Sequence, residues 1–428
     1  MFKISIHIFL LLYLIFVISC SNVEETKNDL IIHSEKIKNE YVYFAKQGIS
    51  ENWENSEGIV LEDKKSKWKV TKNLVGNSFP ILSLFFLDDN NGWAGSKNYI
   101  YKTIDSGKNW ESIPISFIGD ADVKSLYFTD VSRGWIVLQR NGSKFSYSEE
   151  DKIDVFRTED GGRNWELSYT ENSVVLTDTH FSDTAIWIVG KKFIGYSPLR
   201  LEPLIVRYID ETKEWKNISN SVKDIFTEKE SLDYTFPILE AVTTTNLNCI
   251  AVITNKVSLI QSCNNGDDWQ LTDVYENKVP QIGINKFGFE KDYLWILEAA
   301  GGVEGTVSRL ITVPLRDQRE KVKITALKDV YLNYGYWITS QEFIACGTRN
   351  RNKFNKIHDT NDIVKNDVIL LTQDGGKTWD EIYKSPNNTK FNLCFITNIN
   401  LIWIIDENSH VKKITKLGIS AQTQEKYQ

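Results

Sequence analysis

The side chains that most often carry out chemistry are few and scattered in this sequence. Its five histidines lie far apart, and its cysteines show no Cys-x-x-Cys spacing of the kind that binds zinc. The Gly-x-Ser-x-Gly, His-Glu-x-x-His and P-loop motifs do not occur. We therefore predict no metal, no cofactor and no catalytic residue, and look next for residues that bind, anchor or hold the fold.

One pair of cysteines is close enough in sequence to form a disulfide. Cys249 and Cys263 fall on what we expect to be neighbouring strands of one hairpin. A disulfide between them is one interpretation, and two buried free thiols are the other.

The first twenty residues form an export signal. Lys3 provides the positive charge that is typical of the start of a signal peptide. Residues 4–19 are an almost unbroken apolar run that is short for a membrane span. The run ends in Val17-Ile18-Ser19-Cys20, which resembles the cleavage box of bacterial lipoproteins. That resemblance implies a lipid on Cys20 and a place in the bacterial cell envelope, at the outer membrane or cell surface. A plain signal peptide or an uncleaved anchor is the alternative.

An eight-residue motif with the pattern Ser/Thr-x-Asp-x-Gly-x-x-Trp recurs along the chain. Its spacing of about 50 residues is typical of a repeat architecture. Four copies are nearly complete: Asp105, Gly107, Trp110; Asp160, Gly162, Trp165; Asn264, Gly266, Trp269; and Asp374, Gly376, Trp379. Three degenerate copies retain fewer of the motif residues: Asp63 with Trp68, Asp210 with Trp215, and Asp317 alone.

Each residue type of the motif suits a tight turn between two strands. Glycine adopts positive φ without strain, and an aspartate side chain accepts hydrogen bonds from turn amides. The tryptophan begins the next strand and buries a large ring. We therefore assign these residues a structural role.

A second element, an apolar hairpin, precedes each motif. Phe85 to Gly95 and Phe128 to Val137 are clear copies, in which a Gly-Trp pair opens the second strand. Together the two elements make seven units of four strands, an all-β seven-bladed β-propeller. A lone strand around Trp68 completes the last blade and closes the ring. We expect a signal peptide at 1–19, a lipid anchor and polar tether at 20–56, the propeller at 57–416 and a tail at 417–428.

The eight-residue motif resembles the Asp-box, or bacterial neuraminidase repeat. Its combination with the Gly-Trp hairpin is similar to the photosystem II assembly and stability factor family and its non-photosynthetic bacterial relatives. Sialidases and sortilin share the motif more distantly. The resemblance covers about residues 60–416 and implies the fold. In that family a basic patch receives a partner polypeptide, but this chain has eleven arginines and a net charge of −7, so that role does not transfer.

The composition and the loops indicate a binding protein. The net negative charge disfavours nucleic acid as a partner. Long loops on a rigid scaffold are common binding sites, and Arg and Tyr are favoured anchors. We expect them on the face opposite the turns: Arg140, Tyr147, Tyr196, Arg200, Tyr234, Arg349, Arg351 and His358.

We interpret the chain as a monomeric, lipid-anchored, non-catalytic propeller that binds a protein, peptide or glycan in an assembly or scaffold role. The alternative is a glycoside hydrolase of sialidase type. The Phe/Tyr-Arg-Ile-Pro motif with which sialidases begin is absent from this chain, and its seven repeats exceed the six blades of a sialidase ring. A purely structural envelope component is a third hypothesis.

Overall fold

The computed structural model describes most of the chain between residues 60 and 417. The described residues are 60–62, 67–74, 80–115, 120–140, 147–182, 184–196, 199–223, 225–226, 239–244, 249–254, 258–273, 283–290, 293–302, 305–314, 322–339, 341–351, 364–385, 391–398, 401–406 and 410–417. Cys20, Asp63, Tyr234, Asp317 and His358 lie outside them.

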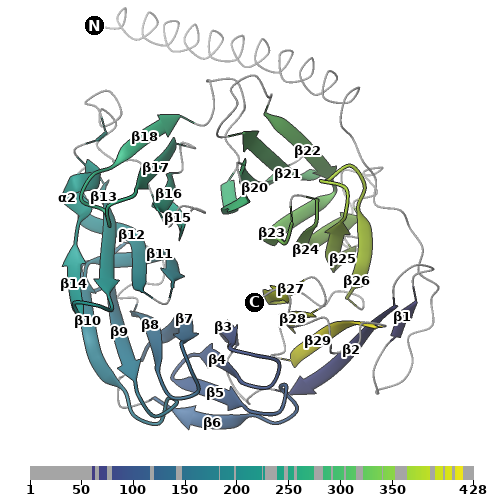
Figure 1. Cartoon of the computed structure of the whole chain (residues 1–428), viewed down its shortest axis with the longest axis horizontal. Coiled ribbons are helices and arrows are strands. Elements are labelled where there is room, and N and C mark those ends of the chain that lie inside the picture. The colour runs from purple at the N-terminus through teal and green to yellow at the C-terminus, as the bar shows by residue number, and fades with distance from the viewer. Residues whose placement is uncertain are drawn as a thin grey trace, which may run out of the picture.

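The described chain is almost entirely strand and forms seven antiparallel sheets around a central axis (Figure 1). Blades 1 to 3 are β3(Ile81–Phe86), β4(Gly92–Ser96), β5(Tyr99–Thr103), β6(Glu111–Pro114); β7(Asp122–Phe128), β8(Gly134–Arg140), β9(Lys152–Thr158), β10(Glu166–Asn172); and β11(Val174–Phe181), β12(Ala185–Tyr196), β13(Leu199–Ile209), β14(Glu214–Asn217). Blades 4 to 6 are β15(Leu239–Thr244), β16(Ile250–Thr254), β17(Ser258–Ser262), β18(Gln270–Asp273); β19(Gly283–Glu290), β20(Tyr293–Gly302), β21(Gly305–Pro314), β22(Lys323–Lys328); and β23(Val330–Trp337), β24(Phe343–Arg351), β25(Val364–Thr372), β26(Asp380–Lys384). A short helix, α2(Ser219–Lys223), follows blade 3.

Blade 7 joins the two ends of the described chain. It contains β27(Phe391–Asn398), β28(Leu401–Asp406) and β29(His410–Leu417), and its fourth strand is β2(Lys67–Leu74), which pairs along β29. The predicted seven-bladed fold and its closure by an N-terminal strand are therefore confirmed. β1(Val60–Glu62) adds a fifth strand that the sequence did not predict.

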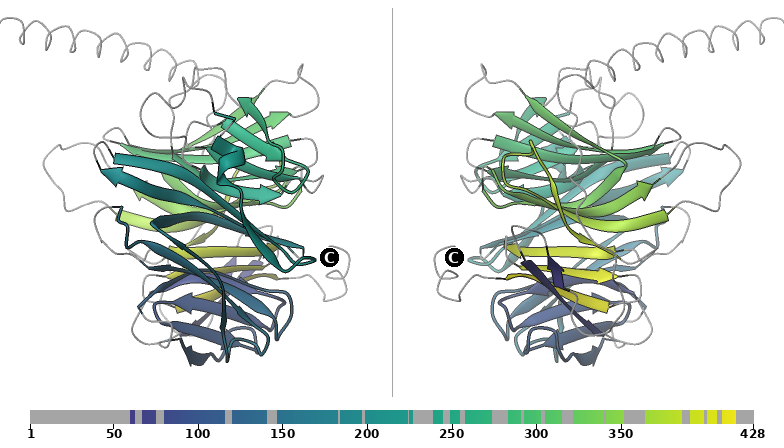
Figure 2. Two further views of the ribbon diagram at one scale, coloured as in Figure 1. Left: turned by 90° about the vertical axis from the view of Figure 1, so that its left-hand side faces the viewer. Right: turned by 90° about the vertical axis from the view of Figure 1, so that its right-hand side faces the viewer.

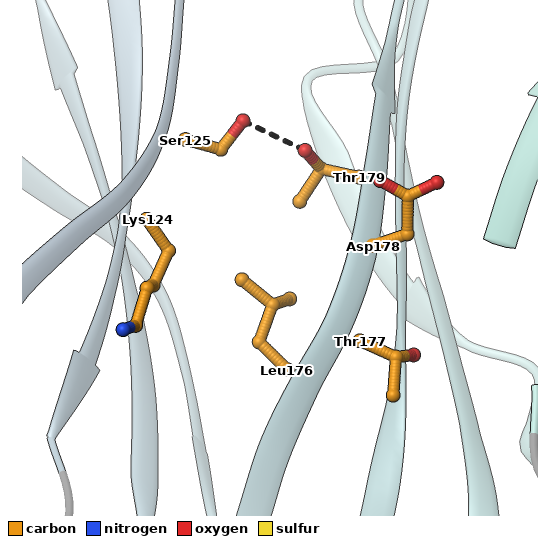
Figure 3. Close-up of a pocket in the computed structure, with 6 residues that line it drawn as sticks. All are labelled: Lys124, Ser125, Leu176, Thr177, Asp178 and Thr179. Atoms are coloured by element: carbon orange, nitrogen blue, oxygen red, sulfur yellow. Dashed lines mark hydrogen bonds between the residues drawn. The ribbon is translucent and has the colours of Figure 1, made fainter. Parts of the chain in front are cut away.

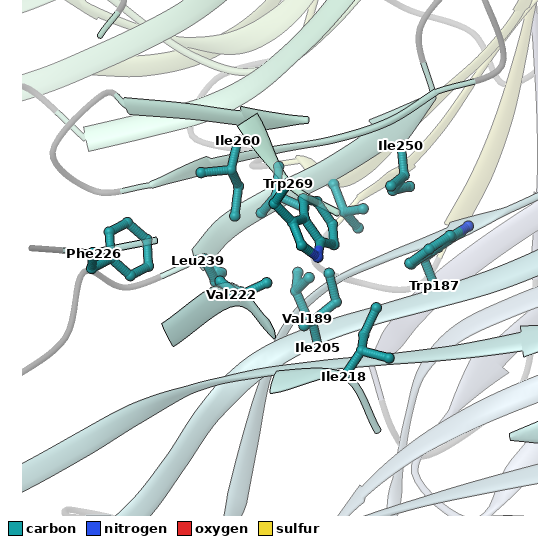
Figure 4. Close-up of a cluster of buried hydrophobic side chains, with 12 residues drawn as sticks. Trp187, Val189, Ile205, Ile218, Val222, Phe226, Leu239, Ile250, Ile260 and Trp269 are labelled. Carbon is teal, nitrogen blue, oxygen red and sulfur yellow. The ribbon is translucent and has the colours of Figure 1, made fainter. Parts of the chain in front are cut away.

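The hydrophobic core is divided into seven clusters, each lying between two adjacent blades. Figure 4 shows the cluster between blades 3 and 4, where Trp187 and Trp269 pack among aliphatic side chains from both sheets. Equivalent clusters fill the other six junctions. The inner strands of each sheet are thus covered on both faces, as in β28, where all six residues are buried, whereas outer strands such as β6 and β14 are mostly exposed. The side views show the sheets fanning out around the ring (Figure 2).

In blades 7 and 1 the tryptophan of the second strand stacks on the following blade. Trp403 stacks on Phe86 with ring centroids 3.8 Å apart, and Trp93 stacks on Phe128 at the same distance. Gly107 lies beside Trp403, and a Cβ built on it would be 3.2 Å from the indole ring. Its φ of 74° also favours glycine, so the turn needs this residue for two reasons.

The eight-residue motif forms the turn between the third and fourth strands, as its chemistry predicts. In blade 1, Thr103 Oγ1 donates to Asp105 Oδ1 and accepts from the Gly107 amide, both at 2.9 Å. The Asn109 amide donates to Asp105, and Trp110 Nε1 donates to the Gly107 carbonyl at 3.0 Å. The bonds from the Asn109 backbone and side chain hold the pKa of Asp105 below its usual value.

The same network recurs at the other near-complete copies. It links Thr158, Asp160, Gly162 and Trp165, and likewise Ser262 with Asn264 and Thr372 with Asp374. The hydrogen bonds of the degenerate copy in blade 3 differ, because Trp215 Nε1 donates to Ser168 Oγ of blade 2. Trp68 lies in β2.

Two disulfides tie strands together. Cys249 and Cys263 are bonded at the ends of the β16–β17 hairpin, which is the pair identified from spacing. Cys346 in β24 is bonded to Cys394 in β27, which links blade 6 to blade 7. Sequence spacing did not reveal this second bond because its cysteines are 48 residues apart and meet only through blade packing.

The stacking of Trp403 gives a first prediction. Its side chain is fully buried between blades 7 and 1, so Trp403→Ala should lower the free energy of unfolding by about 3–5 kcal/mol. Urea unfolding followed by circular dichroism measures this. The control Leu167→Ala changes a side chain that is 50% exposed, and should alter stability by about 0.5 kcal/mol or less. Equal effects from the two substitutions would contradict the account.

Candidate binding site on the inner wall

The first strand of each blade lies nearest the axis and has one edge without a partner strand. In all seven blades its pairing with the second strand shifts by one residue, as at a β-bulge. The extra residues are Leu82, Lys124, Thr177, Glu240, Asn285, Asn333 and Asn392. Bulges discourage pairing with another strand. The inner wall is therefore suited to contacts through side chains.

Side chains near the bulges connect neighbouring blades at three junctions. Ser83 Oγ donates to the Val123 carbonyl at 2.8 Å, between blades 1 and 2. Thr177 Oγ1 donates to the Leu239 carbonyl at 2.7 Å, and Asn285 Nδ2 to the Leu332 carbonyl at 2.5 Å. Each acceptor immediately precedes the bulge residue of its own blade. These bonds hold the first strands of these blades close together.

A pocket of about 220 Å³ lies at the junction of blades 2 and 3. Its lining comes wholly from β7 and β11: Lys124, Ser125, Leu176, Thr177, Asp178 and Thr179. Ser125 and Thr179 share a 2.7 Å hydrogen bond at one end, and Leu176 points into the space between the strands (Figure 3). At this junction the side-chain bond between the two innermost strands is the one that joins Ser125 of β7 to Thr179 of β11.

Gln139 fixes blade 3 to blade 2 next to this pocket. Its Oε1 accepts from the Leu176 amide at 2.8 Å, and its Nε2 donates to the Val174 carbonyl at 3.1 Å. The same Nε2 lies within hydrogen-bond distance of two carbonyls of its own blade. Gln139 is buried, so these bonds satisfy polar groups that have no access to water. The opening between β7 and β11 is therefore held in place.

Charged groups lie along the same strands. Lys124 Nζ is 3.0 Å from Asp122, and both side chains are about a third exposed. Asp178 Oδ2 accepts from the Val242 amide at 3.1 Å and is 3.7 Å from Lys286 of blade 5. The Asp178 carboxylate is directed away from Lys124 (Figure 3). Lys124 thus provides the pocket with a cation, and its ion pair with Asp122 is weak because both side chains are partly exposed to solvent.

A half-buried histidine lies one residue beyond the pocket lining. His180 Nε2 itself is buried and has no hydrogen-bond partner among the described residues. Burial lowers the pKa of His180 to about 4, against the opposing effect of Asp178, and Lys286 lowers it further. The imidazole is therefore neutral near pH 7.

The predicted loop-face residues do not form one site. Arg140 Nε is 2.7 Å from the buried Asp154, and Arg349 is 3.1 Å from Glu381 within blade 6. Tyr196 donates to the Tyr147 carbonyl across blades 2 and 3. Arg200 is exposed on β13, and Arg351 ends β24. Arg140 and Arg349 thus serve ion pairs inside the fold, whereas Tyr147, Tyr196 and Arg200 gather at the outer end of blade 3.

Sequence reasoning missed the pocket residues. Lys124 and Thr177 each lie four residues before the aromatic residue that ends their strand, Phe128 and Phe181. That constant position is a signal that would have located the inner wall.

The described residues contain no group of three or more His, Cys, Asp or Glu side chains placed to hold a metal ion. They also contain no helix long and apolar enough to span a membrane.

Comparison with known proteins supports the fold. No protein-family model matches the chain, and no curated protein matches it. YCF48 bound to D1 peptide is similar, with 16% identity and a TM-score of 0.52 over 81% of this chain and 94% of that one. YCF48 from Cyanidioschyzon merolae has 12% identity and the same score, over 81% and 98%. An ulvan lyase, a polysaccharide lyase, has 10% identity and a TM-score of 0.51, over 83% and 98%. At these identities the likeness shows the propeller fold alone.

His180 gives a second prediction. Its pKa is about 4 when folded and about 6.5 when unfolded, so the unfolded chain binds more protons between these values. Its contribution to stability is present above pH 6.5 and is lost as the pH falls to 4, by roughly 3 kcal/mol at most. Urea unfolding at pH 7 and pH 4.5 should show a smaller acid loss for His180→Gln than for the wild type. Equal losses would contradict the burial of this imidazole.

Proposed function

We propose that this chain is an exported, lipid-anchored, non-catalytic propeller that binds a protein or peptide partner in an assembly or scaffold role. Its partner would contact the inner wall at the junction of blades 2 and 3. The observation that carries the proposal is the pocket between β7 and β11, the innermost strands of blades 2 and 3.

The size of the pocket favours one side chain of a larger partner. Sites for whole small molecules usually have volumes of about 300–1,000 Å³, and this one has about 220 Å³. A peptide that places one residue here would make its remaining contacts along the inner wall. YCF48, whose fold this chain shares, is known in a complex with D1 peptide, which supports a peptide as a ligand for such a propeller.

The chemistry of the pocket favours an acidic residue. Lys124 offers a cation whose pairing with Asp122 is solvent-exposed and easily exchanged. The pocket is also lined by Leu176 and by the hydroxyl-bearing side chains of Ser125 and Thr179. An Asp or Glu residue supplies a carboxylate that would pair with Lys124.

The membrane anchor is the second part of the proposal. It depends on the Val17-Ile18-Ser19-Cys20 box, which gives Cys20 as the lipid-bearing residue, residues 1–19 as signal peptide and residues 20–56 as anchor and tether. The two disulfides support export, because such bonds persist mainly outside the cytosol.

Lipid attachment is tested directly by metabolic labelling. The chain expressed in a Gram-negative host should incorporate labelled fatty acid, and its first peptide should begin at a diacylglyceryl-modified Cys20. Cys20→Ser should abolish the label. Incorporation that persists in this variant, or a mature chain that begins elsewhere without lipid, would contradict the anchor.

Peptide binding is tested with residues 21–428 against arrays of acidic, neutral and basic peptides and of glycans. We expect an acidic peptide to bind, and Lys124→Gln to weaken it about tenfold through loss of one charge-assisted contact. The control Lys377→Gln removes an exposed lysine from the turn of blade 6 and should leave binding unchanged. Preference for a glycan, above all one that is cleaved, would contradict the proposal and favour a glycoside hydrolase.

A further inference from the structure

The junction between β7 and β11 continues past the pocket towards the ends of the two strands. The hydrogen bond between Ser125 and Thr179 lies at one end of the pocket (Figure 3). Two residues further along each strand, the rings of Tyr127 and Phe181 stack, with centroids 5.2 Å apart and planes inclined by 12°. The strands that line the pocket therefore also hold an aromatic pair beside it.

The stacked pair belongs to a row of four aromatic rings. The ring centroid of Phe85 in blade 1 is 5.1 Å from that of Tyr127, and the centroid of Phe395 in blade 7 is 6.1 Å from that of Phe85. We call Phe395, Phe85, Tyr127 and Phe181 the aromatic arc. These residues lie on β27, β3, β7 and β11, the innermost strands of their blades (Figure 1). The arc thus runs along the inner wall across blades 7, 1, 2 and 3.

The fold does not require an aromatic ring at this level of the inner wall. Phe395, Phe85 and Tyr127 each pair directly with the tryptophan of the second strand in their blade. The residue that pairs with the corresponding tryptophan is His180 in blade 3 and Gly288 in blade 5. Those two blades form the same four-stranded sheet without a ring there. The aromatic residues of blades 7, 1 and 2 therefore need a further explanation.

The rings of the arc differ from those that fill the core. Phe86 and Phe128 directly follow Phe85 and Tyr127 in the chain; they are buried and stack on tryptophans of the preceding blades. The four rings of the arc pack partly against core clusters but are only half-buried. Because they lie on the innermost strands, their exposed parts belong to the inner wall. Clustered aromatic side chains at a protein surface are typical of binding hot spots.

The packing within the arc favours an apolar side chain over a sugar as its ligand. Phe181 covers one face of the Tyr127 ring, and the ring of Phe85 approaches Tyr127 at an angle of 62°. A sugar ring stacks on an open aromatic face, whereas an apolar side chain also packs against ring edges.

The distance between the arc and the pocket fits one short peptide segment. Lys124 lies three residues before Tyr127 in β7, which is about 10 Å along the strand. An extended peptide advances by about 3.3 Å per residue. A peptide whose acidic residue meets Lys124 would therefore reach the arc with a residue about two to four positions away.

We infer that the aromatic arc binds an apolar side chain of the peptide partner, about two to four residues from the acidic residue that binds at Lys124. The arc thereby selects one peptide among many acidic ones, because a single ion pair at a partly exposed lysine gives little affinity of its own. This inference rests on the proposed function for the place of the acidic residue, but it names a contact that the pocket does not make.

Peptides that differ in one residue test the contact on the unaltered protein. Labelled Gly-Ser peptides carry one aspartate, and a phenylalanine or a serine is placed from one to eight positions away on either side of it. Fluorescence anisotropy with the full chain should show about tenfold tighter binding with phenylalanine than with serine at two to four positions on one side. At seven or eight positions phenylalanine should give no gain.

Tyr127→Leu tests the arc from the side of the protein. The matched control is Tyr99→Leu, which also replaces a half-buried tyrosine but lies in β5, the third strand of blade 1. Tyr127→Leu should reduce the gain from phenylalanine to about threefold or less, and Tyr99→Leu should leave it at about tenfold. If either variant fails to fold in urea titrations, the peptide series on the wild-type chain still decides the question.

Four results would overturn the inference: no gain from phenylalanine at two to four positions, an equal gain at every position, a gain that persists in full in Tyr127→Leu, or a glycan that competes with the peptides and depends on Tyr127. The proposed function fails separately. If Lys124→Gln weakens the acidic peptides while phenylalanine gives no gain, only the arc is contradicted. If the Tyr127-dependent gain remains at two to four positions while Lys124→Gln changes nothing, the contact at Lys124 is contradicted and the arc is supported.

Discussion

Burial of both faces of every sheet is the constraint on which this structure depends. A single four-stranded blade has no core of its own, and each of the seven hydrophobic clusters draws its side chains from two neighbours. The stacks of Trp403 on Phe86 and of Trp93 on Phe128 show the arrangement most clearly. Closing the blades into a ring gives every sheet a neighbouring sheet on each side, so no sheet face is left uncovered. Closure by β2 therefore determines whether the first and last blades are buried at all.

The same constraint leaves the inner strands as the place where local variation is tolerated. Their bulges sit at one position in all seven blades, but the residue at that position ranges from leucine to lysine. Thr177 and Asn285 at this position bond to the next blade. Lys124 at the same position turns to Asp122, and the pocket forms beside it. The role of the side chain at this position thus differs from blade to blade.

Features set by local chemistry were predictable from the sequence, and features set by packing between blades were not. The turn around Asp105 follows from its own eight residues, and Trp68 marked the closing strand. The Cys346–Cys394 bond and the pairing of Arg349 with Glu381 depend on which strands become neighbours. The pocket depends on how Gln139 holds β11, a contact with no trace in the repeat pattern. Loop length therefore gave no indication of the pocket on the inner wall.

Site-specific photocrosslinking tests the central claim, that a polypeptide occupies the inner wall between blades 2 and 3, most directly. A photoreactive amino acid would replace Thr177 in the pocket or Glu166 on the outer strand β10, in the full-length protein in living cells. The account predicts a covalent adduct with a polypeptide at position 177, whose crosslinked segment contains an acidic residue, and no such adduct at position 166. Equal crosslinking at both positions, or an adduct only with glycan at position 177, would contradict it.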